Sequence, residues 1–176
     1  VAGRTPAKGF FPLDQEMAVV RSFGLPADVL GMTVNWGRSV IEGRSTATAV
    51  EHTRAVADAG LLRALVLSGA TGETTAWGDP WGDMHIPPRG DAPAFASSAA
   101  SLLGPQEVAE TLAAAGDVPR VGLKWAARPA DADVAAHVRF NALFLKDIYH
   151  EGRILRAYLE PQPDDEVLHV SDEVAR

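Results

Sequence analysis

Three short apolar runs with the character of β-strands alternate along the chain with segments that have the character of helices. The strands are expected over residues 29–34, 61–67 and 121–125, and the helices that follow them over 45–59, 105–116 and 133–150. Continuous apolar runs of this length are typical of strands that are buried on both faces of a parallel sheet. The order β-α-β-α-β-α therefore predicts an α/β chain with parallel strands and right-handed crossovers.

Local signals predict where several of these helices begin and end. A further short helix is expected over residues 13–22, with Gly24 and Pro26 ending it. In the 45–59 helix, Thr48 and Glu51 are expected to form a capping box, and Gly60 to supply the stop. We expect one packed domain over residues 1–150 and a loose acidic tail over 151–176.

Composition excludes several classes of protein. The net charge of −7 argues against a nucleic-acid partner, because phosphate binding draws on clustered Lys and Arg. There are no cysteines, which excludes disulfides, thiolate metal sites and Cys nucleophiles and fits a reducing, cytoplasmic compartment. No apolar stretch approaches the roughly 18 residues of a membrane span.

The chemistry-bearing residues gather where strands give way to loops, which is where α/β sheets place ligand sites. The long loop over residues 68–103 is rich in Trp and Asp in its first half, which we interpret as site, and in Ala and Ser over 91–101, which we interpret as spacer. Asp83 and His85 are spaced by two, so both side chains leave an extended segment on one side and can converge on an ion such as Zn, Mn or Co. The alternative is that both residues only shape the loop beside Pro87 and Pro88.

A second group follows the first strand. Asn35 could orient a substrate hydroxyl, and Arg38 could clamp a phosphate or carboxylate with its planar fork. Glu42 is a candidate general base, since a carboxylate in a dry pocket is more easily protonated. The structural alternative pairs Arg38 with Glu42 as an ion pair.

Lys124 and three tryptophans complete the candidate residues. Lys124 follows the last strand and is either an acid/base group at the mouth of the sheet or a surface lysine beside Trp125. Trp36, Trp77 and Trp81 are candidates for stacking on the apolar face of a sugar, with an ordinary role as lids of the loop as the alternative.

The order of these motifs resembles a known family. The motifs are Pro6-Ala-Lys-Gly-Phe10, Asn35-Trp-Gly-Arg-Ser39 with Glu42, Leu67-Ser-Gly69, Asp83-x-His85 and Gly122-x-Lys124. Over roughly residues 3–128 the chain resembles the later half of a xylose isomerase-like TIM barrel, in an uncharacterised bacterial branch of the sugar phosphate isomerase/epimerase-like superfamily. The expected fold is therefore a partial barrel of parallel β/α units.

The resemblance also implies an activity. It implies a metal-dependent isomerase or epimerase of a small sugar or hydroxy-carbonyl compound, with a divalent metal (Mn, Zn, Co or Mg) at Asp83 and His85. Lys124 or Glu42 would be the acid/base, with Asn35, Trp36, Arg38, Trp77 and Trp81 around the substrate.

The sequence departs from the family pattern at two strand ends and at its start. Asn35 stands where a charged or imidazole ligand is expected, Lys124 stands where family enzymes often carry a metal-binding Glu, and the early strands have no counterpart. Two alternatives therefore stay open. One is a non-catalytic sugar- or metabolite-binding protein on the same scaffold. The other is an inactive barrel fragment that needs a partner, for example as a homodimer.

Overall fold

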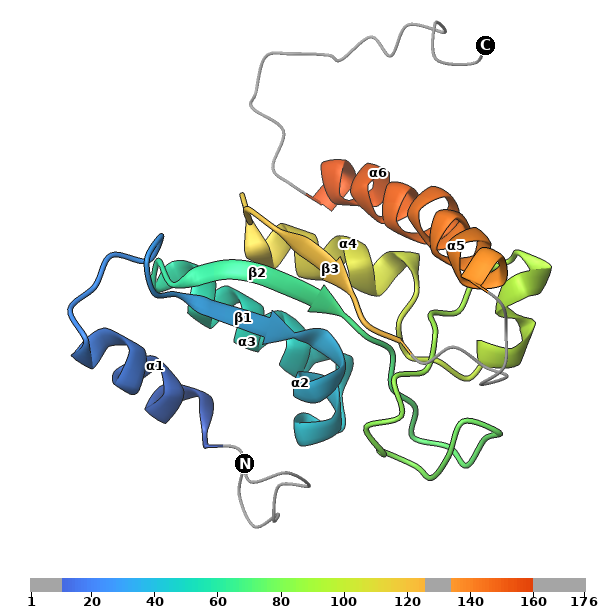
Figure 1. The fold of residues 1–176 in the computed structure, drawn as a ribbon, viewed down its shortest axis with the longest axis horizontal. Coiled ribbons are helices and arrows are strands. Elements are labelled where there is room, and N and C mark those ends of the chain that lie inside the picture. The colour runs from blue at the N-terminus through green and yellow to red at the C-terminus, as the bar shows by residue number, and fades with distance from the viewer. Residues whose placement is uncertain (1–10, 126–133, 160–176) are drawn as a thin grey trace, which may run out of the picture.

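A three-stranded parallel sheet forms the centre of the molecule (Figure 1). The computed structural model describes residues 11–125 and 134–159. The strands are β1 (Met32–Asn35), β2 (Leu62–Leu67) and β3 (Val121–Leu123), in the order β1-β2-β3. Both pairings are parallel, which confirms the expected α/β class.

The helices follow the strands along the chain in the order that the sequence predicts, with additions. They are α1 (Leu13–Ser22), α2 (Trp36–Gly43), α3 (Thr46–Asp58), the 3-10 helix η1 (Pro93–Ser98), α4 (Pro105–Ala115), α5 (Val134–Leu143), the π-helical segment η2 (Phe144–Tyr149) and α6 (His150–Leu159). None of the helices in the described ranges is long and apolar enough to cross a membrane.

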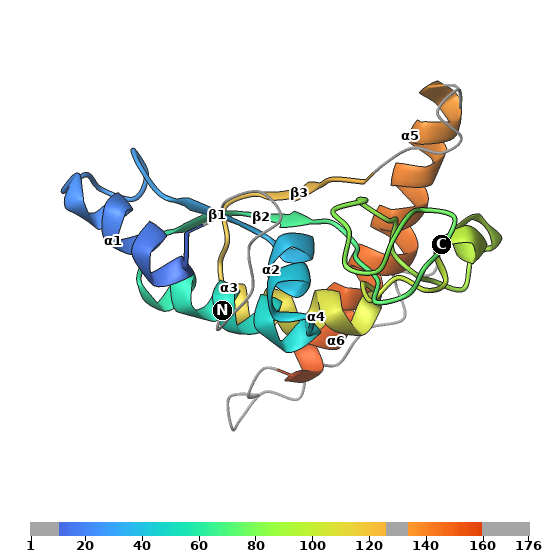
Figure 2. The ribbon, with the colours of Figure 1, turned by 90° about the horizontal axis from the view of Figure 1, so that it is seen from below.

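The core lies between the sheet and the helices on one of its sides, as Figure 2 shows for α2, α3 and α4. Along β2, Leu62, Leu65 and Leu67 are buried, whereas Ala64 and Val66 are only partly buried. Since side chains alternate along a strand, Leu65 and Leu67 face the helices, and Ala64 and Val66 face the opposite side. That opposite face is not covered by a helix layer in the part of the chain that the structure describes.

The uncovered face of the sheet carries small and polar residues in register. Asn35 of β1 pairs with Val66 of β2, which pairs in turn with Gly122 of β3. Residues that are paired across parallel strands point to the same face, so these three form one layer. Thr33 pairs with Ala64 to form the layer below.

Several predicted boundaries need correction. Ser45 is the N-cap of α3 and accepts a hydrogen bond from the Ala47 backbone N–H at 3.2 Å, so Thr48 and Glu51 lie inside the helix and form no capping box there. Gly60 has φ 69° and ends α3 as expected. The segment over 91–101 is not a spacer, because it contains η1 and buries Phe95 and Ser98.

The C-terminal helical region extends further than expected. Helix α6 runs to Leu159 and packs against α4 (Figure 1), so it belongs to the folded unit. Gly152 is buried, and a Cβ at this position would meet Val108 Cγ1 at 2.5 Å and the Pro105 carbonyl oxygen at 3.1 Å. The rest of the predicted acidic tail, residues 160–176, lies outside the described residues.

We predict that Gly152→Ala destabilises the fold by separating α6 from α4. Overpacking costs about 1–3 kcal/mol, which exceeds the gain of about 0.5–1 kcal/mol from replacing a helical glycine. Gly122→Ala is the matched control, because its Cβ would meet only Val66 Cγ2, at 3.9 Å. Urea denaturation of the three proteins measures the difference, and a Gly152→Ala protein as stable as the wild type would contradict the seating of α6 on α4.

Candidate functional site

Three of the predicted site residues converge at the carboxyl ends of β1 and β2. Arg38 Nη1 lies 3.3 Å from Asp83 Oδ2, and Asp83 Oδ1 lies 3.2 Å from His85 Nδ1. The side chain of Asp83 is 11% exposed, whereas those of Arg38 and His85 are each 23% exposed. The cluster therefore combines a sheltered carboxylate with a cation and an imidazole that both reach solvent.

Arg38 owes its position to the turn from β1 into α2. Asn35 ends β1 and caps α2, with its Oδ1 accepting a hydrogen bond from the Arg38 backbone N–H at 3.3 Å. The predicted substrate-orienting residue is thus a helix N-cap, which is a common role for asparagine. Gly37 lies against the backbone of Ser68, and a Cβ at this position would overlap the Ser68 carbonyl oxygen.

His85 lies in a segment that is paired to the loop leaving β2. Gly69 forms an isolated antiparallel bridge with Ile86, and a Cβ at Gly69 would overlap the Ile86 carbonyl oxygen. His85 itself has φ 54°, a left-handed conformation that is uncommon for residues other than glycine. Such residues persist only where the surrounding structure holds them, and they concentrate at functional sites.

Ser68 belongs to this cluster, although it was not among the candidate residues. It is 1% exposed, and its Oγ lies 3.4 Å from His85 Nδ1. The sequence signal was present, since Ser68 is the first polar residue after the buried run of β2. A serine after a strand is so common that the signal does not identify a site on its own.

The tryptophans occupy three different environments. Trp36 is fully buried in the core, and its indole N–H is a buried donor without a hydrogen-bond acceptor among the described residues. Trp77 is 5% exposed, and its Nε1 donates to the Ser97 carbonyl at 2.7 Å. The structure therefore places both in packing positions rather than on an open binding surface.

Trp81 is the tryptophan that remains available at the loop surface. It is half-buried with φ 60°, and the Arg44 guanidinium lies 5.9 Å from its ring centroid. Arg44 also has a positive φ, 52°, at the C-cap of α2. Of the three predicted stacking residues, Trp81 is the one whose environment suits a ligand.

The two predicted acid/base residues are not brought into the cluster. Glu42 is half-buried further along α2, and Lys124 is exposed just after β3. Neither side chain takes part in a hydrogen bond or ion pair within residues 11–125 and 134–159. The alternative of a structural Arg38–Glu42 ion pair is also wrong for these residues, since the ion pair of Arg38 is with Asp83.

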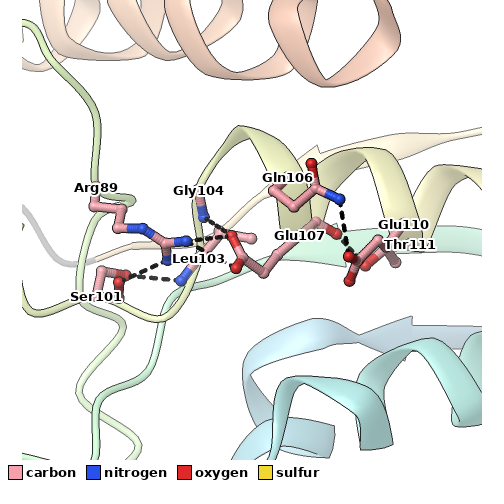
Figure 3. A network of polar contacts seen from close by, with 8 residues as sticks. All are labelled: Arg89, Ser101, Leu103, Gly104, Gln106, Glu107, Glu110 and Thr111. Carbon is pink, nitrogen blue, oxygen red and sulfur yellow. Dashed lines mark hydrogen bonds and ion pairs between the residues drawn. The ribbon is translucent and has the colours of Figure 1, made fainter. Parts of the chain in front are cut away.

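The loop that carries Asp83 and His85 is fastened to the start of α4 (Figure 3). Arg89 Nη2 lies 2.8 Å and 2.7 Å from the two carboxylate oxygens of Glu107, and its Nη1 donates to the Ser101 carbonyl at 3.0 Å. Glu107 also accepts a hydrogen bond from the Gly104 backbone N–H at 3.0 Å. The Glu107 carboxylate thus caps α4 and also binds Arg89, which follows His85 in the loop.

With this geometry established, comparison with known proteins places the chain in a family. The profile of a domain of unknown function (DUF4862) matches residues 1–140. The chain belongs to that family.

The comparisons name no activity. The DUF4862 chain is 37% identical over 89 residues to an uncharacterized protein of Salmonella typhimurium, and the match covers 49% of this chain and 26% of that protein. The match therefore spans about a quarter of the length of this curated relative. No solved structure matches the chain. The Pro6–Phe10 motif that contributed to the resemblance lies outside the described residues.

Asp83 and His85 would supply only two ligands of the expected metal site. One carboxylate and one imidazole are donors that suit Zn, Mn or Co. In the ranges that the structure describes, however, no three His, Cys, Asp or Glu side chains are grouped to hold a metal ion. A complete metal centre would therefore need ligands from beyond these residues.

We predict that Arg89→Ala costs about 1.5–3 kcal/mol of stability, in the range of hydrogen bonds to charged groups. This range applies rather than the 0–1 kcal/mol of a surface pair, because Arg89 Nη2 contacts both carboxylate oxygens and the Glu107 side chain is only 16% exposed. Gln106→Ala is the control on the same helix, since its pair with Glu110 is exposed and worth about 0.2–0.5 kcal/mol. Equal losses in urea denaturation would show that Arg89 does not fasten the loop.

Proposed function

We propose that this DUF4862 chain carries part of the active site of a metal-dependent isomerase or epimerase that acts on a small sugar or hydroxy-carbonyl compound. The observation that carries the proposal is the Arg38–Asp83–His85 cluster at the carboxyl ends of two parallel strands. Ligand sites of parallel α/β sheets form at this edge. An imidazole, a carboxylate and a guanidinium together can hold a cation and an oxygen-rich ligand side by side.

The proposal includes a barrel of the xylose isomerase-like TIM type. Helices on one face and a layer of small or polar residues on the other are what a segment of such a barrel presents, with Asn35, Val66 and Gly122 facing its interior. A complete barrel has eight strands, so the remaining strands have to come from beyond the described residues or from a second copy of the chain. A homodimer is therefore one form of the proposed protein.

The proposed division of labour follows from the chemistry of each side chain. A divalent ion (Mn, Zn, Co or Mg) at the Asp83/His85 loop would polarise the carbonyl and hydroxyl oxygens of the substrate. Trp81 offers a ring face to the sugar. Lys124 or Glu42 would move the proton between adjacent carbons, which requires either side chain to turn toward the cluster.

The second candidate is a non-catalytic protein that binds a sugar or another metabolite in a cytoplasmic setting. One observation favours it: the neighbour of Asp83 is the cation Arg38, whereas a metal site would place further carboxylates there. A guanidinium beside a carboxylate and an imidazole can recognise hydroxyl groups without a metal ion.

We predict that Mn, Co or Zn raises the thermal midpoint of the wild type and not that of His85→Ala. A metal at about 100 times its Kd adds roughly 2.7 kcal/mol, which corresponds to roughly 5–10 °C for a chain of this size. His150→Ala is the matched control, because His150 is exposed on α6. Stabilisation by a pentose or hexose without metal would favour the binding protein, and no shift with any of the ions would contradict the metal-dependent enzyme.

A further inference from the structure

Two polar contacts of the His85 ring reach the same nitrogen. Asp83 Oδ1 lies 3.2 Å from His85 Nδ1, and Ser68 Oγ lies 3.4 Å from that atom. A serine nucleophile with a histidine base and an orienting aspartate would need the serine and the aspartate on opposite nitrogens of the ring. The arrangement is therefore not a Ser-His-Asp triad, and Ser68 is not an activated nucleophile here.

We infer that His85 acts through Nε2, and that Asp83 is a positioning residue that fixes the tautomer of His85. An ionised carboxylate has no proton to donate, so the Asp83–His85 contact is attractive only when Nδ1 carries the hydrogen. Ser68 could instead donate its hydroxyl proton to an unprotonated Nδ1. The carboxylate is both nearer to Nδ1 and negatively charged, so it favours the hydrogen on Nδ1, and the Ser68 hydroxyl can accept from the same N–H.

The position of the carboxylate is itself fixed by Arg38. The guanidinium holds Asp83 Oδ2 while Oδ1 faces the imidazole, so the two oxygens serve two different partners. The left-handed backbone at His85 sets the direction from which the ring enters the cluster. The ring plane and the tautomer are thus determined before any ligand is bound.

The tautomer divides the roles of the two residues that were expected to act as equal ligands. With Nδ1 protonated, the lone pair of the ring is on Nε2, which is the atom able to bind a divalent cation or accept a proton. Asp83 then acts through His85, in the arrangement by which carboxylates orient metal-binding histidines. The identity of the ion rests on the proposed function, whereas the tautomer does not.

Long-range ¹H–¹⁵N correlation NMR of the uniformly labelled, metal-free chain tests the tautomer directly. The chain has five histidines, and the His85 signals are those that vanish in His85→Gln. In alkaline buffer, where imidazoles are neutral, we expect Nδ1 to be protonated and Nε2 to be unprotonated. An Nε2–H tautomer in the wild type overturns the inference, and this spectrum needs no variant other than the assignment control.

Asp83→Ala tests whether the carboxylate is the cause. We expect the population to move toward the Nε2–H tautomer in this variant and to stay unchanged in Asp79→Ala. Asp79 is exposed in the same loop. An unchanged tautomer in a folded Asp83→Ala protein would show that Asp83 does not position the ring.

Zn²⁺ titration separates this inference from the proposed function. If Zn²⁺ binds the wild type, we expect His85→Ala to abolish binding and Asp83→Ala to weaken it by about 10–100-fold, as loss of an orienting partner does. Equal abolition in both variants would make Asp83 a direct ligand and contradict the inference. If Zn²⁺ does not bind, the metal-dependent function fails, and the NMR spectra alone decide the role of Asp83.

Discussion

Two close backbone approaches at the carboxyl end of β2 determine the arrangement of everything around the site. Gly37 brings the start of α2 onto the Ser68 carbonyl, and Gly69 brings the segment that carries His85 onto the β2 exit. A side chain at either glycine would have to displace backbone atoms, which cannot rotate away as the end of a flexible side chain can. Because both segments are pressed against one strand end, Arg38 and His85 come within reach of the same carboxylate.

The ion pair between Arg38 and Asp83 depends on that arrangement and in turn stabilises it. A carboxylate that is 11% exposed has lost most of its water and needs charged or polar partners in its place. The guanidinium and the imidazole supply them from two segments that the glycines have already brought together. Moving α2 away from the loop would separate Arg38 from Asp83 and leave the carboxylate poorly solvated. The cluster therefore also fixes the relative positions of α2 and the loop.

Local signals in the sequence predict much of the fold, and long-range contacts account for most of what they miss. Helix α1, strand β2 and helix α4 are bounded by Gly and Pro, and their predicted limits agree closely with the structure. Helix α2 was missed because Asn35-Trp-Gly-Arg has the composition of a binding loop, and its cap is visible only once Asn35 faces the Arg38 amide.

The spacing of Asp83 and His85 identified them as a pair, whereas the contact between Arg38 and Asp83 joins residues 45 apart. No local pattern encodes that separation. Trp36 was expected to stack on a sugar, but an aromatic residue near a loop is equally suited to pack in the core, where Trp36 is buried.

The loop that carries the site is held at both ends, and this bears on what a ligand has to supply. The Leu102 backbone N–H donates to the Ala70 carbonyl at 2.8 Å, and Arg89 is bonded both to the Leu103 carbonyl and to Glu107. Because these contacts order the segment in the folded chain, the entropic cost of ordering it is incurred on folding and not on ligand binding. The left-handed conformation at His85 lies beside the Gly69–Ile86 bridge in the same segment, so its cost also falls on folding. The Asp83/His85 loop is therefore ordered before a ligand binds. The rest of the proposed barrel would have to supply further ligands and cover the open face of the sheet.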